Sequence, residues 1–368
     1  MKQLKWIRRT VCAVSAAAIG LTATLFVRAD AAPKKLVVLG DSISAGYGLL
    51  EGEKGYYDIL SDCTGMQLTN YAVSGYETKD LLAQLEKDEI KNTIKEADVI
   101  CMSIGSNDML HPTIEFIEKL KEQDDEDLYD LMRRLVADDE IVSLSTDLTR
   151  SLREPINIAK ENIKTIEKQI RELNSNAQVI MFTLYNPFET KQNMFYDGKD
   201  YSSDYETFMD YVNGQENKIS SVIKNLETVD VADISACFRG SGWVYLRDEI
   251  NDIHPNPVGH ALIASAVMGV MKAESTKSPE FVKVISEMTA ADRADLPAVN
   301  REMLLKYAVP MGDLDGNDKW EKKDAEALIK YVSENEDGQL SDASSALSDI
   351  NGDGSIDILD VTAILAMQ

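Results

Sequence analysis

Short apolar runs alternate with longer amphipathic segments over most of the chain, from Lys34 to about Lys272. Runs of this length, bounded by small and polar residues, predict β-strands. The five predicted strands are Leu36–Leu39, Gln67–Val73, Ala97–Ile104, Gln178–Leu184 and Val229–Ile234. The segments between and after them predict helices, the clearest of which are 79–95, 156–173 and 257–271. Continuous apolar strands separated by helices are typical of a parallel sheet with both faces covered.

Small or polar residues follow four of the predicted strands at the point where each one ends. They are residues 40–42 (Gly-Asp-Ser), 74–75 (Ser-Gly), 105–108 (Gly-Ser-Asn-Asp) and 186–187 (Asn-Pro). In open parallel sheets, ligands bind beyond the carboxyl ends of the strands. We therefore predict a functional site at this edge of the sheet.

Two stretches depart from the alternating pattern. Residues 113–154 are acidic and longer than an ordinary connection, which predicts either a helical insertion at the rim of the site or a solvated excursion without a role. Residues 274–310 predict a connector with helical stretches. The connector lacks the Pro, Thr and Ser bias of an extended linker, so we expect it to hold the parts that it joins close together.

The first residues have the pattern of an export signal. Basic residues precede an apolar run from Val11 to Val27, and Ala29-Asp30-Ala31 then offers a small-x-small cleavage site. The apolar run is almost long enough to remain as a membrane anchor, but the adjacent cleavage site favours removal of residues 1–31. No later run is long and apolar enough to span a membrane, so we expect no stable membrane span in the mature form.

The negative charge of the chain argues against polyanionic partners. The formal net charge is -25, and removal of residues 1–31 takes away five basic residues and one acidic residue, which gives -29. Such a surface repels nucleic acid and anionic lipid headgroups. Three cysteines, Cys63, Cys101 and Cys237, remain after residue 31, and an odd number cannot form a full disulfide framework.

The residues at the predicted edge include the catalytic groups that an ester hydrolase needs. Such an enzyme needs a nucleophile, a base, a group that orients the base and donors for the oxyanion. Ser42 follows the first strand and is the predicted nucleophile. Among the three histidines, His254 precedes the last predicted helix and is the predicted base. His260 lies within that helix, which favours a structural role, whereas His111 follows the third strand and is a candidate for the neighbourhood of the site.

Three groups predict an oxyanion hole. Asn107 can donate through its side-chain amide, and Gly75 offers a backbone N–H without steric obstruction. With the backbone N–H of Ser42 they make three donors, each of which is worth on the order of 3 kcal/mol in a transition state.

Four sequence blocks resemble the SGNH, or GDSL, family of esterases and lipases. In the family's order, they are Gly40–Ile43 (GDSI), Asn70–Gly75 (NYAVSG), Gly105–Asp108 (GSND) and His254–Asn256 (HPN). The resemblance covers Lys34 to about Lys272 and implies a three-layer α/β/α flavodoxin-like hydrolase domain, to which we assign residues 32–273. It also implies that Ser42 is the nucleophile, His254 the base, and Ser42, Gly75 and Asn107 the oxyanion donors.

One position differs from the family pattern. The family usually has Asp three residues before the histidine, and this chain has Asn251 there. Asp252 is adjacent, out of register by one. An amide can orient imidazole but stabilises imidazolium less than a carboxylate does. The sequence leaves two arrangements open: a Ser–His dyad assisted by Asn251 or a backbone carbonyl, and a local shift that brings Asp252 to His254.

Two calcium-loop patterns lie thirty-six positions apart near the C-terminus. Calcium takes about six to eight oxygens, which such a loop supplies from alternating positions and from position twelve. The predicted ligands are Asp313, Asp315, Asn317, Lys319 through its carbonyl, Glu321 and Asp324 in the first loop, and Asp349, Asn351, Asp353, Ser355, Asp357 and Asp360 in the second. A predicted helix follows each loop. Gly354 supplies the sharp turn in the second loop, where the first has Asp318, so we expect weaker binding by the first.

The pair of loops, from about Met311 to Gln368, resembles a dockerin domain. Asp324 and Asp360 end the loops as in dockerins, where EF-hands usually have Glu. The resemblance implies structural Ca²⁺ and binding to a cohesin domain of a scaffold protein, as in cellulosomes. Positions ten and eleven often influence partner choice in that family, and here they differ between the halves (Lys322-Lys323 and Ile358-Leu359).

Together these features predict a secreted serine ester hydrolase that needs no cofactor for catalysis. It would cleave acyl or acetyl esters, with acylated plant polysaccharide as the expected substrate, while docked to a cohesin outside the cell. Residues 185–188 (Tyr-Asn-Pro-Phe), together with residues 113–154 if they act as a lid over the site, suggest a lipase or lysophospholipase instead. Asn251 leaves room for a third alternative, a scaffold component with weak activity.

Overall fold

The internal contacts divide the chain into Met1–Pro33 and Lys34–Gln368, and the second unit contains the features that follow. The computed structural model describes residues 32–120, 141–187, 189, 195–196, 199–200, 202–247, 252–309, 312–314, 321–333, 348 and 356–367. The predicted signal segment, Asn251 and most of the predicted calcium ligands lie outside the described residues.

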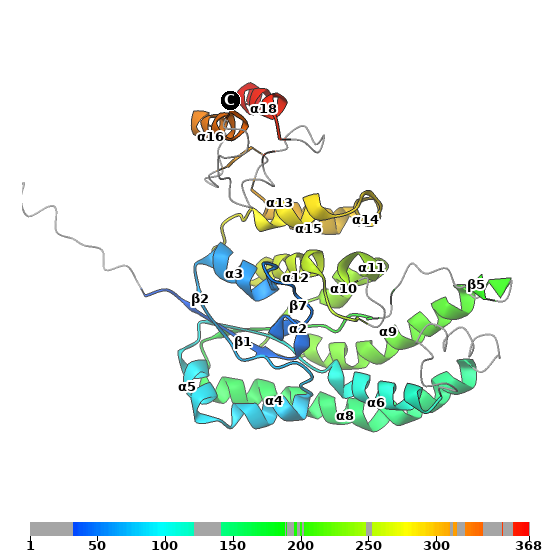
Figure 1. The fold of residues 1–368 in the computed structure, drawn as a ribbon. Helices are drawn as coiled ribbons and strands as arrows, with labels where there is room; N and C mark the ends of the chain where they lie inside the picture. Colours follow the sequence, from blue (N-terminus) through cyan, green and yellow to red (C-terminus); the bar gives the residue numbers. More distant parts are fainter. Residues whose placement is uncertain are drawn as a thin grey trace, which may run out of the picture. The chain divides into compact units, whose positions relative to one another are not determined.

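Five parallel strands form the central sheet, in the order β2-β1-β3-β4-β7 (Figure 1). They are β1 (Lys35–Gly40), β2 (Gln67–Asn70), β3 (Val99–Ser103), β4 (Gln178–Phe182) and β7 (Asp230–Ala232). All five predicted strands are present, and the flavodoxin-like order is confirmed. The winding direction changes between β1 and β3, which pair directly, and ligands bind at such a switch point.

Different helices cover the two faces of the sheet (Figure 1). Alternate residues of β1 point to opposite faces, so Leu36 and Val38 join one hydrophobic cluster and Val37 and Leu39 the other. The first cluster includes α3 (Tyr56–Thr64), α10 (Ile234–Phe238), α11 (Gly242–Tyr245) and α12 (Pro257–Val270). The second includes α4 (Thr78–Leu85), α5 (Asp88–Glu96), α6 (Asn107–Glu118), α8 (Ile141–Leu173) and α9 (Ser202–Lys224). The three-layer α/β/α prediction is confirmed.

Two helix predictions were wrong in their bounds. The predicted helix 79–95 is two helices, because the chain becomes extended at Lys87 and a new helix begins with Asp88 and Glu89, whose charges favour an N-terminus. The predicted helix 156–173 begins earlier, at Ile141. Both flanks of the acidic stretch 113–154 are therefore helical, and residues 121–140 lie outside the described part. A short antiparallel pair, β5 (Phe195–Tyr196) and β6 (Lys199–Asp200), precedes α9.

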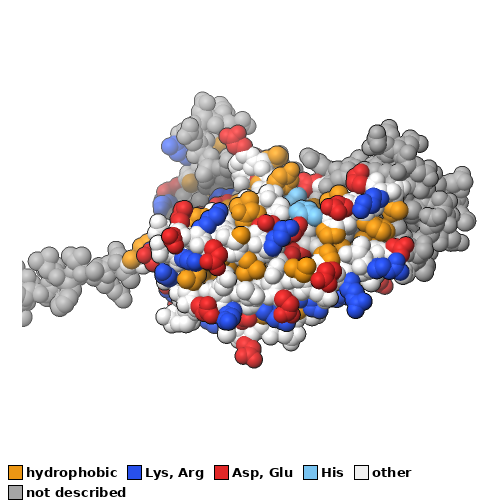
Figure 2. Space-filling model, turned by 90° about the horizontal axis from the view of Figure 1, so that it is seen from below, with side chains coloured by type: hydrophobic (Ala, Val, Ile, Leu, Met, Phe, Trp, Pro, Cys, Tyr) orange, Lys and Arg blue, Asp and Glu red, His pale blue; other side chains and the backbone are white. Residues whose placement is uncertain are grey.

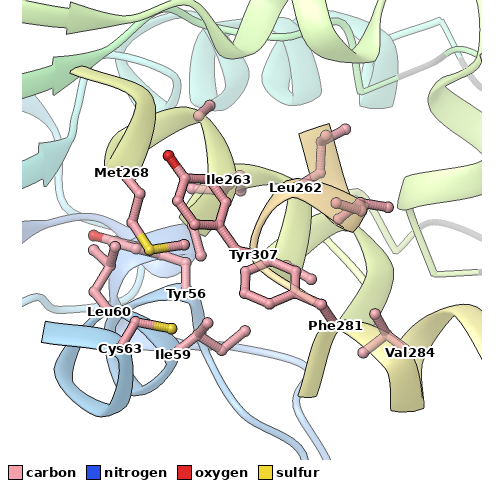
Figure 3. Packing of buried hydrophobic residues seen from close by; sticks show 14 of the residues in the cluster. Tyr56, Ile59, Leu60, Cys63, Leu262, Ile263, Met268, Phe281, Val284 and Tyr307 are labelled. Atoms are coloured by element: carbon pink, nitrogen blue, oxygen red, sulfur yellow. The ribbon is translucent and has the colours of Figure 1, made fainter. Parts of the chain in front are cut away.

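The predicted connector packs as part of the hydrolase domain. It forms α13 (Glu280–Glu287), α14 (Ala290–Asp295) and α15 (Ala298–Lys306). Phe281, Val284 and Tyr307 lie against Leu262 of α12 and Ile59 of α3 in one hydrophobic cluster (Figure 3). This cover explains why α12 is buried on almost every side.

Polar contacts fix the same connector. Asn300 donates to the carbonyl oxygen of Cys237 at 2.6 Å and to the hydroxyl of Tyr245 at 2.5 Å. Ser265 of α12 donates to the carbonyl oxygen of Met303 at 2.6 Å. The segment therefore belongs to the folded core and is not a flexible linker.

The described part of the C-terminal region contains two helices, α16 (Lys322–Ser333) and α18 (Ile358–Met367), which pack on each other. Leu328, Val361 and Ile364 are buried. Both helices predicted after the calcium loops are therefore present. Among the described residues, no helix combines the length and apolar character needed to cross a bilayer.

The surface shown in Figure 2 is mixed in charge. Acidic and basic side chains are interspersed on this face, and hydrophobic side chains lie between them (Figure 2). The large negative net charge therefore does not appear on this face as one continuous field.

Candidate active site

The turn after β1 places Ser42 at the edge of the sheet. Gly40 has φ +116°, and a Cβ there would lie 1.9 Å from the carbonyl oxygen of Ser103, so no larger residue fits. Asp41 caps the short helix α2 (Ser42–Ala45) by accepting a hydrogen bond from the backbone N–H of Ile43 at 3.2 Å. Ser42 is the first helical residue, so its own N–H has no partner within the helix.

Ser42, His254 and Asp252 form one hydrogen-bonded chain. The Oγ of Ser42 lies 2.9 Å from Nε2 of His254, and Nδ1 of His254 lies 2.7 Å from Oδ1 of Asp252. The same carboxylate oxygen accepts the backbone N–H of His254 at 3.0 Å. A hydroxyl, an imidazole and a carboxylate in this order can generate a nucleophile and stabilise the imidazolium that results.

The local geometry brings Asp252, two residues before the histidine, into contact with His254. This is the second of the two arrangements that the sequence left open. Asn251 lies outside the described residues. The loop is held from the sheet side, because the hydroxyl of Tyr185 donates to the carbonyl oxygen of Ile253 at 2.8 Å.

The other two histidines are engaged elsewhere. His260 is fully buried in α12, and its Nδ1 accepts the backbone N–H of Tyr56 at 3.3 Å. Burial lowers the pKa of His260 to about 3, which keeps the ring neutral. This agrees with the predicted structural role. Nδ1 of His111 lies 2.8 Å from Oε1 of Glu77, an interaction that does not include Ser42.

The predicted oxyanion donors lie on neighbouring turns at the same edge. Asn107 is buried and donates one amide hydrogen to the carbonyl oxygen of Tyr76 at 2.9 Å, which leaves its second hydrogen for a ligand. Gly75, the neighbour of Tyr76, has φ +83°. The contact from Asn107 therefore fixes the turn that contains Gly75.

A buried polar network beneath Ser42 was not predicted from the sequence. The Oγ of Ser103 donates to Asp41 at 2.6 Å and lies 2.7 Å from the Oγ of Ser44, which lies 2.8 Å from the hydroxyl of Tyr56. Burial, and to a lesser degree the charge of Asp108, raise the pKa of Asp41 to about 7. Isolated serines and a tyrosine carry no periodic signal, so a sequence does not reveal which of them converge.

An apolar pocket opens beside Ser42 and His254. It encloses about 760 Å³, with open solvent at its mouth included. Its walls include Met109 and Leu110 of α6, Leu148 and Leu152 of α8, and Tyr211 of α9. The apolar lining beside Ser42 suits the acyl chain of an ester.

One acidic side chain lies in the wall of this pocket. Glu216 of α9 is 5% exposed. Burial, and then the nearby charge of Glu189, raise the pKa of Glu216 well above its usual range. A buried carboxyl in the wall of this pocket was not predicted, because the sequence places Glu216 on an ordinary amphipathic helix.

The described parts of the calcium loops hold buried carboxylates at the first and last positions. Asp313, Asp324 and Asp360 are at most 1% exposed. In both loops the backbone N–H at position nine donates to the aspartate at position twelve, from Glu321 at 2.8 Å and from Asp357 at 2.9 Å. Buried carboxylates at ligand positions fit a hard cation, which takes oxygen ligands. Among the described residues, no three His, Cys, Asp or Glu side chains are grouped so that they could hold a metal ion.

Comparisons with known proteins found matches for both the hydrolase part and the C-terminal part of the chain. A family model described as the GDSL-like Lipase/Acylhydrolase family matches residues 38–262, and the Dockerin type I domain matches residues 311–366. The uncharacterized protein YpmR of Bacillus subtilis is 25% identical over 65% of this chain and 82% of its own length. The spore germination lipase LipC of Bacillus licheniformis is 27% identical over 60% of this chain and 89% of its own length.

A solved structure is similar over the hydrolase part. The lipase Lip_vut3 from a goat rumen metagenome has 22% sequence identity and a TM-score of 0.46, and the match covers 65% of this chain and 98% of that one. Because the family model spans most of residues 34–272, the chain belongs to the GDSL-like lipase/acylhydrolase family and is an ester hydrolase. It ends in a dockerin type I domain. The predicted family resemblances are confirmed.

Proposed function

We propose that this member of the GDSL-like lipase/acylhydrolase family is a secreted esterase that cleaves acyl or acetyl esters of plant polysaccharide while docked to a cohesin through its C-terminal domain. The observation that carries the esterase mechanism is the chain of hydrogen bonds from Ser42 through His254 to Asp252 at the mouth of an apolar pocket. The polysaccharide substrate is inferred from the dockerin domain, which would bring the enzyme to a wall-degrading complex.

The proposed mechanism has two half-reactions. His254 Nε2 takes the proton of Ser42 as Oγ attacks the ester carbonyl carbon, and Asp252 stabilises the imidazolium. The oxyanion accepts hydrogen bonds from the N–H groups of Ser42 and Gly75 and from the amide of Asn107. His254 then protonates the departing alkoxide, which leaves an acyl-enzyme. A water molecule, deprotonated by His254, attacks the acyl carbon and releases the acid and the Ser42 hydroxyl.

The apolar pocket favours a second candidate, a lipase-like acylhydrolase for longer chains. Its walls are mostly hydrophobic beside Ser42, which suits an acyl chain longer than acetyl. The 27% identity to the spore germination lipase LipC supports the same class. Under either candidate the reaction at Ser42 is the same and the preferred acyl length differs.

The C-terminal domain is proposed to bind calcium and then a cohesin. Asp313 and Asp324 in the first loop, and Asp360 in the second, would be ligands together with the other predicted oxygens of residues 315–321 and 349–357. Calcium would neutralise the carboxylates and order the loops; it has no part in the steps at Ser42. The second loop should bind more tightly, since Gly354 permits its turn.

Hydrolysis rates on a series of substrates would test the proposed function. Acetylated xylan and p-nitrophenyl esters from acetate to palmitate should be compared at equal enzyme concentration. Activity on acetylated xylan and short esters supports the polysaccharide esterase, and activity that rises with chain length supports the lipase-like candidate. No hydrolysis of any ester, with Ser42 unlabelled by a serine-directed phosphonate, would contradict both.

A further inference from the structure

The segment between α2 and α3, residues 46–55, contacts the loop that contains Asp252 and His254. The ring of Tyr47 lies 4.5 Å from the imidazole of His254, centroid to centroid, with the planes tilted by 47°. A Cβ at Gly48 would lie 3.5 Å from Oδ2 of Asp252 and 3.7 Å from Cβ of His254. We name residues 46–55 the strap, because its backbone passes directly against the acid and the base.

One carboxylate connects the strap to the base. Glu53 closes a turn of the strap by accepting the backbone N–H of Leu50 at 2.8 Å. It also forms an ion pair with Arg247, and the two side chains are 22% and 13% exposed. The backbone N–H of Arg247 in turn donates to the carbonyl oxygen of His254 at 3.1 Å. A continuous path of polar contacts therefore runs from the strap to His254.

The position of Asp252 explains why this path of contacts can affect catalysis. A single oxygen of Asp252 accepts both the backbone N–H and the Nδ1 of His254, so acid and base are parts of one short loop. Their mutual geometry is set within that loop, but their distance from Ser42 depends on where the loop as a whole is held. Tyr185 holds Ile253 from the sheet side, and the strap contacts the flanking residues Asp252 and His254.

We propose that Glu53 and Arg247 are positioning residues, and that their ion pair latches the strap over the Asp252–His254 loop so that Nε2 of His254 stays within hydrogen-bond reach of Ser42. The inference rests on the proposed catalytic roles of Ser42, His254 and Asp252. The partly buried pair is screened less than the exposed ion pairs of the surface, so it can hold a geometry that they cannot.

The test is a double-mutant cycle on the full chain, with a soluble p-nitrophenyl ester. Glu53→Gln keeps an acceptor for Leu50 but removes the charge, and we expect kcat to fall about tenfold because small displacements of a base are costly. KM should be unchanged, since the pair does not line the pocket. In an Asp252→Asn background, where the orientation of the base is already lost, Glu53→Gln should have little further effect.

A matched control and a second variant complete the test. Asp62→Asn removes the more exposed ion pair to Lys54, at the α3 end of the same strap, and should leave kcat unchanged. If Glu53→Gln does not fold, Tyr47→Leu replaces a side chain that is 55% exposed and should show the same coupling to Asp252. An equal loss of kcat in both backgrounds, or an equal loss in Asp62→Asn, would overturn the positioning role. Phosphonate labelling of Ser42 in the wild type tests the proposed function separately.

Discussion

Buried carboxylates occur in both halves of the chain, but their partners differ. In the hydrolase domain Asp41 accepts the hydroxyl of Ser103, and Asp108 accepts both the backbone N–H and the hydroxyl of Thr78, at 2.9 and 2.6 Å. In the C-terminal domain Asp324 and Asp360 accept backbone N–H groups of their own loops, and the other predicted ligands there are mostly further acids. In the first arrangement the hydrogen bonds come from neutral donors of the fold, although Oδ2 of Asp41 has no partner among the described residues, whereas the second gathers charges of one sign.

This difference indicates which interactions stabilise the structure of each half. The catalytic edge is held by strands β1 and β3, by hydroxyl donors and by the cover of α12. Like charges gathered in a small domain repel one another, so we expect the predicted calcium loops to need a cation that offsets them. We therefore expect the two halves to respond independently to mutation and to chelation.

The largest effect should follow removal of the nucleophile or the base. Ser42→Ala and His254→Ala should each lower kcat for ester hydrolysis by about 10⁴-fold or more, because the members of such a chain act as a unit. Both variants should bind a cohesin as the wild type does. Hydrolysis and cohesin titration on the same preparation give the result, and a variant that loses both activities would contradict the independence of the two halves.

Asp252 should have the next largest effect. Asp252→Asn should lower kcat by about 10²–10⁴-fold, since the amide does not stabilise imidazolium as a carboxylate does. Asn251→Asp is the matched change at the family's usual position and should leave kcat within a few-fold of wild type. Activity that survives in Asp252→Asn but rises strongly in Asn251→Asp would show that the dyad arrangement is the working one.

The fold and the site were predictable to different extents. The strands follow from apolar runs and from turns such as Gly40-Asp41-Ser42, because these depend on local chemistry, whereas the flavodoxin-like fold was implied by the resemblance to the SGNH family. The contact of Asp252 with His254 was left open, since register within an irregular loop is set by neighbours such as Tyr185 that are distant in sequence. The network of Asp41, Ser103 and Tyr56 was missed for the same reason.

Truncation would show how far the hydrolase domain extends. A chain that ends after Ala273 loses Phe281, Leu304 and Tyr307 from the cover of α12 and should be less stable by several kcal/mol, at about 1.5–3 kcal/mol for each large apolar side chain. A chain that ends after Val309 should unfold at the temperature of the full hydrolase domain. The unfolding temperatures of the two truncated chains should be compared. Equal temperatures would show that α13–α15 do not contribute to the stability of the hydrolase domain.

The smallest effect concerns the pH dependence of stability. Because the pKa of Asp41 is raised to about 7 in the folded state, its neutral form stabilises the fold fully below the usual pKa of 3.8, and this contribution is lost as pH rises through about 7. Asp41→Asn keeps the acceptor for Ile43 and cannot ionise. Relative to wild type, the variant should therefore gain stability between pH 5 and pH 8. Urea unfolding at pH 5 and pH 8 gives the free energy of unfolding of both proteins. A variant that loses stability relative to wild type between pH 5 and pH 8 would contradict the raised pKa of Asp41.

The most direct test measures both activities of the full chain in calcium and in EDTA. Hydrolysis of a soluble p-nitrophenyl ester should be unchanged by EDTA, whereas binding to a cohesin should be lost and should return with added calcium. Asp349→Ala with Asp360→Ala should weaken cohesin binding more than Asp313→Ala with Asp324→Ala. Loss of hydrolysis in EDTA, or cohesin binding that persists without calcium, would contradict the proposed division between a site completed by its own fold and a domain completed by an ion.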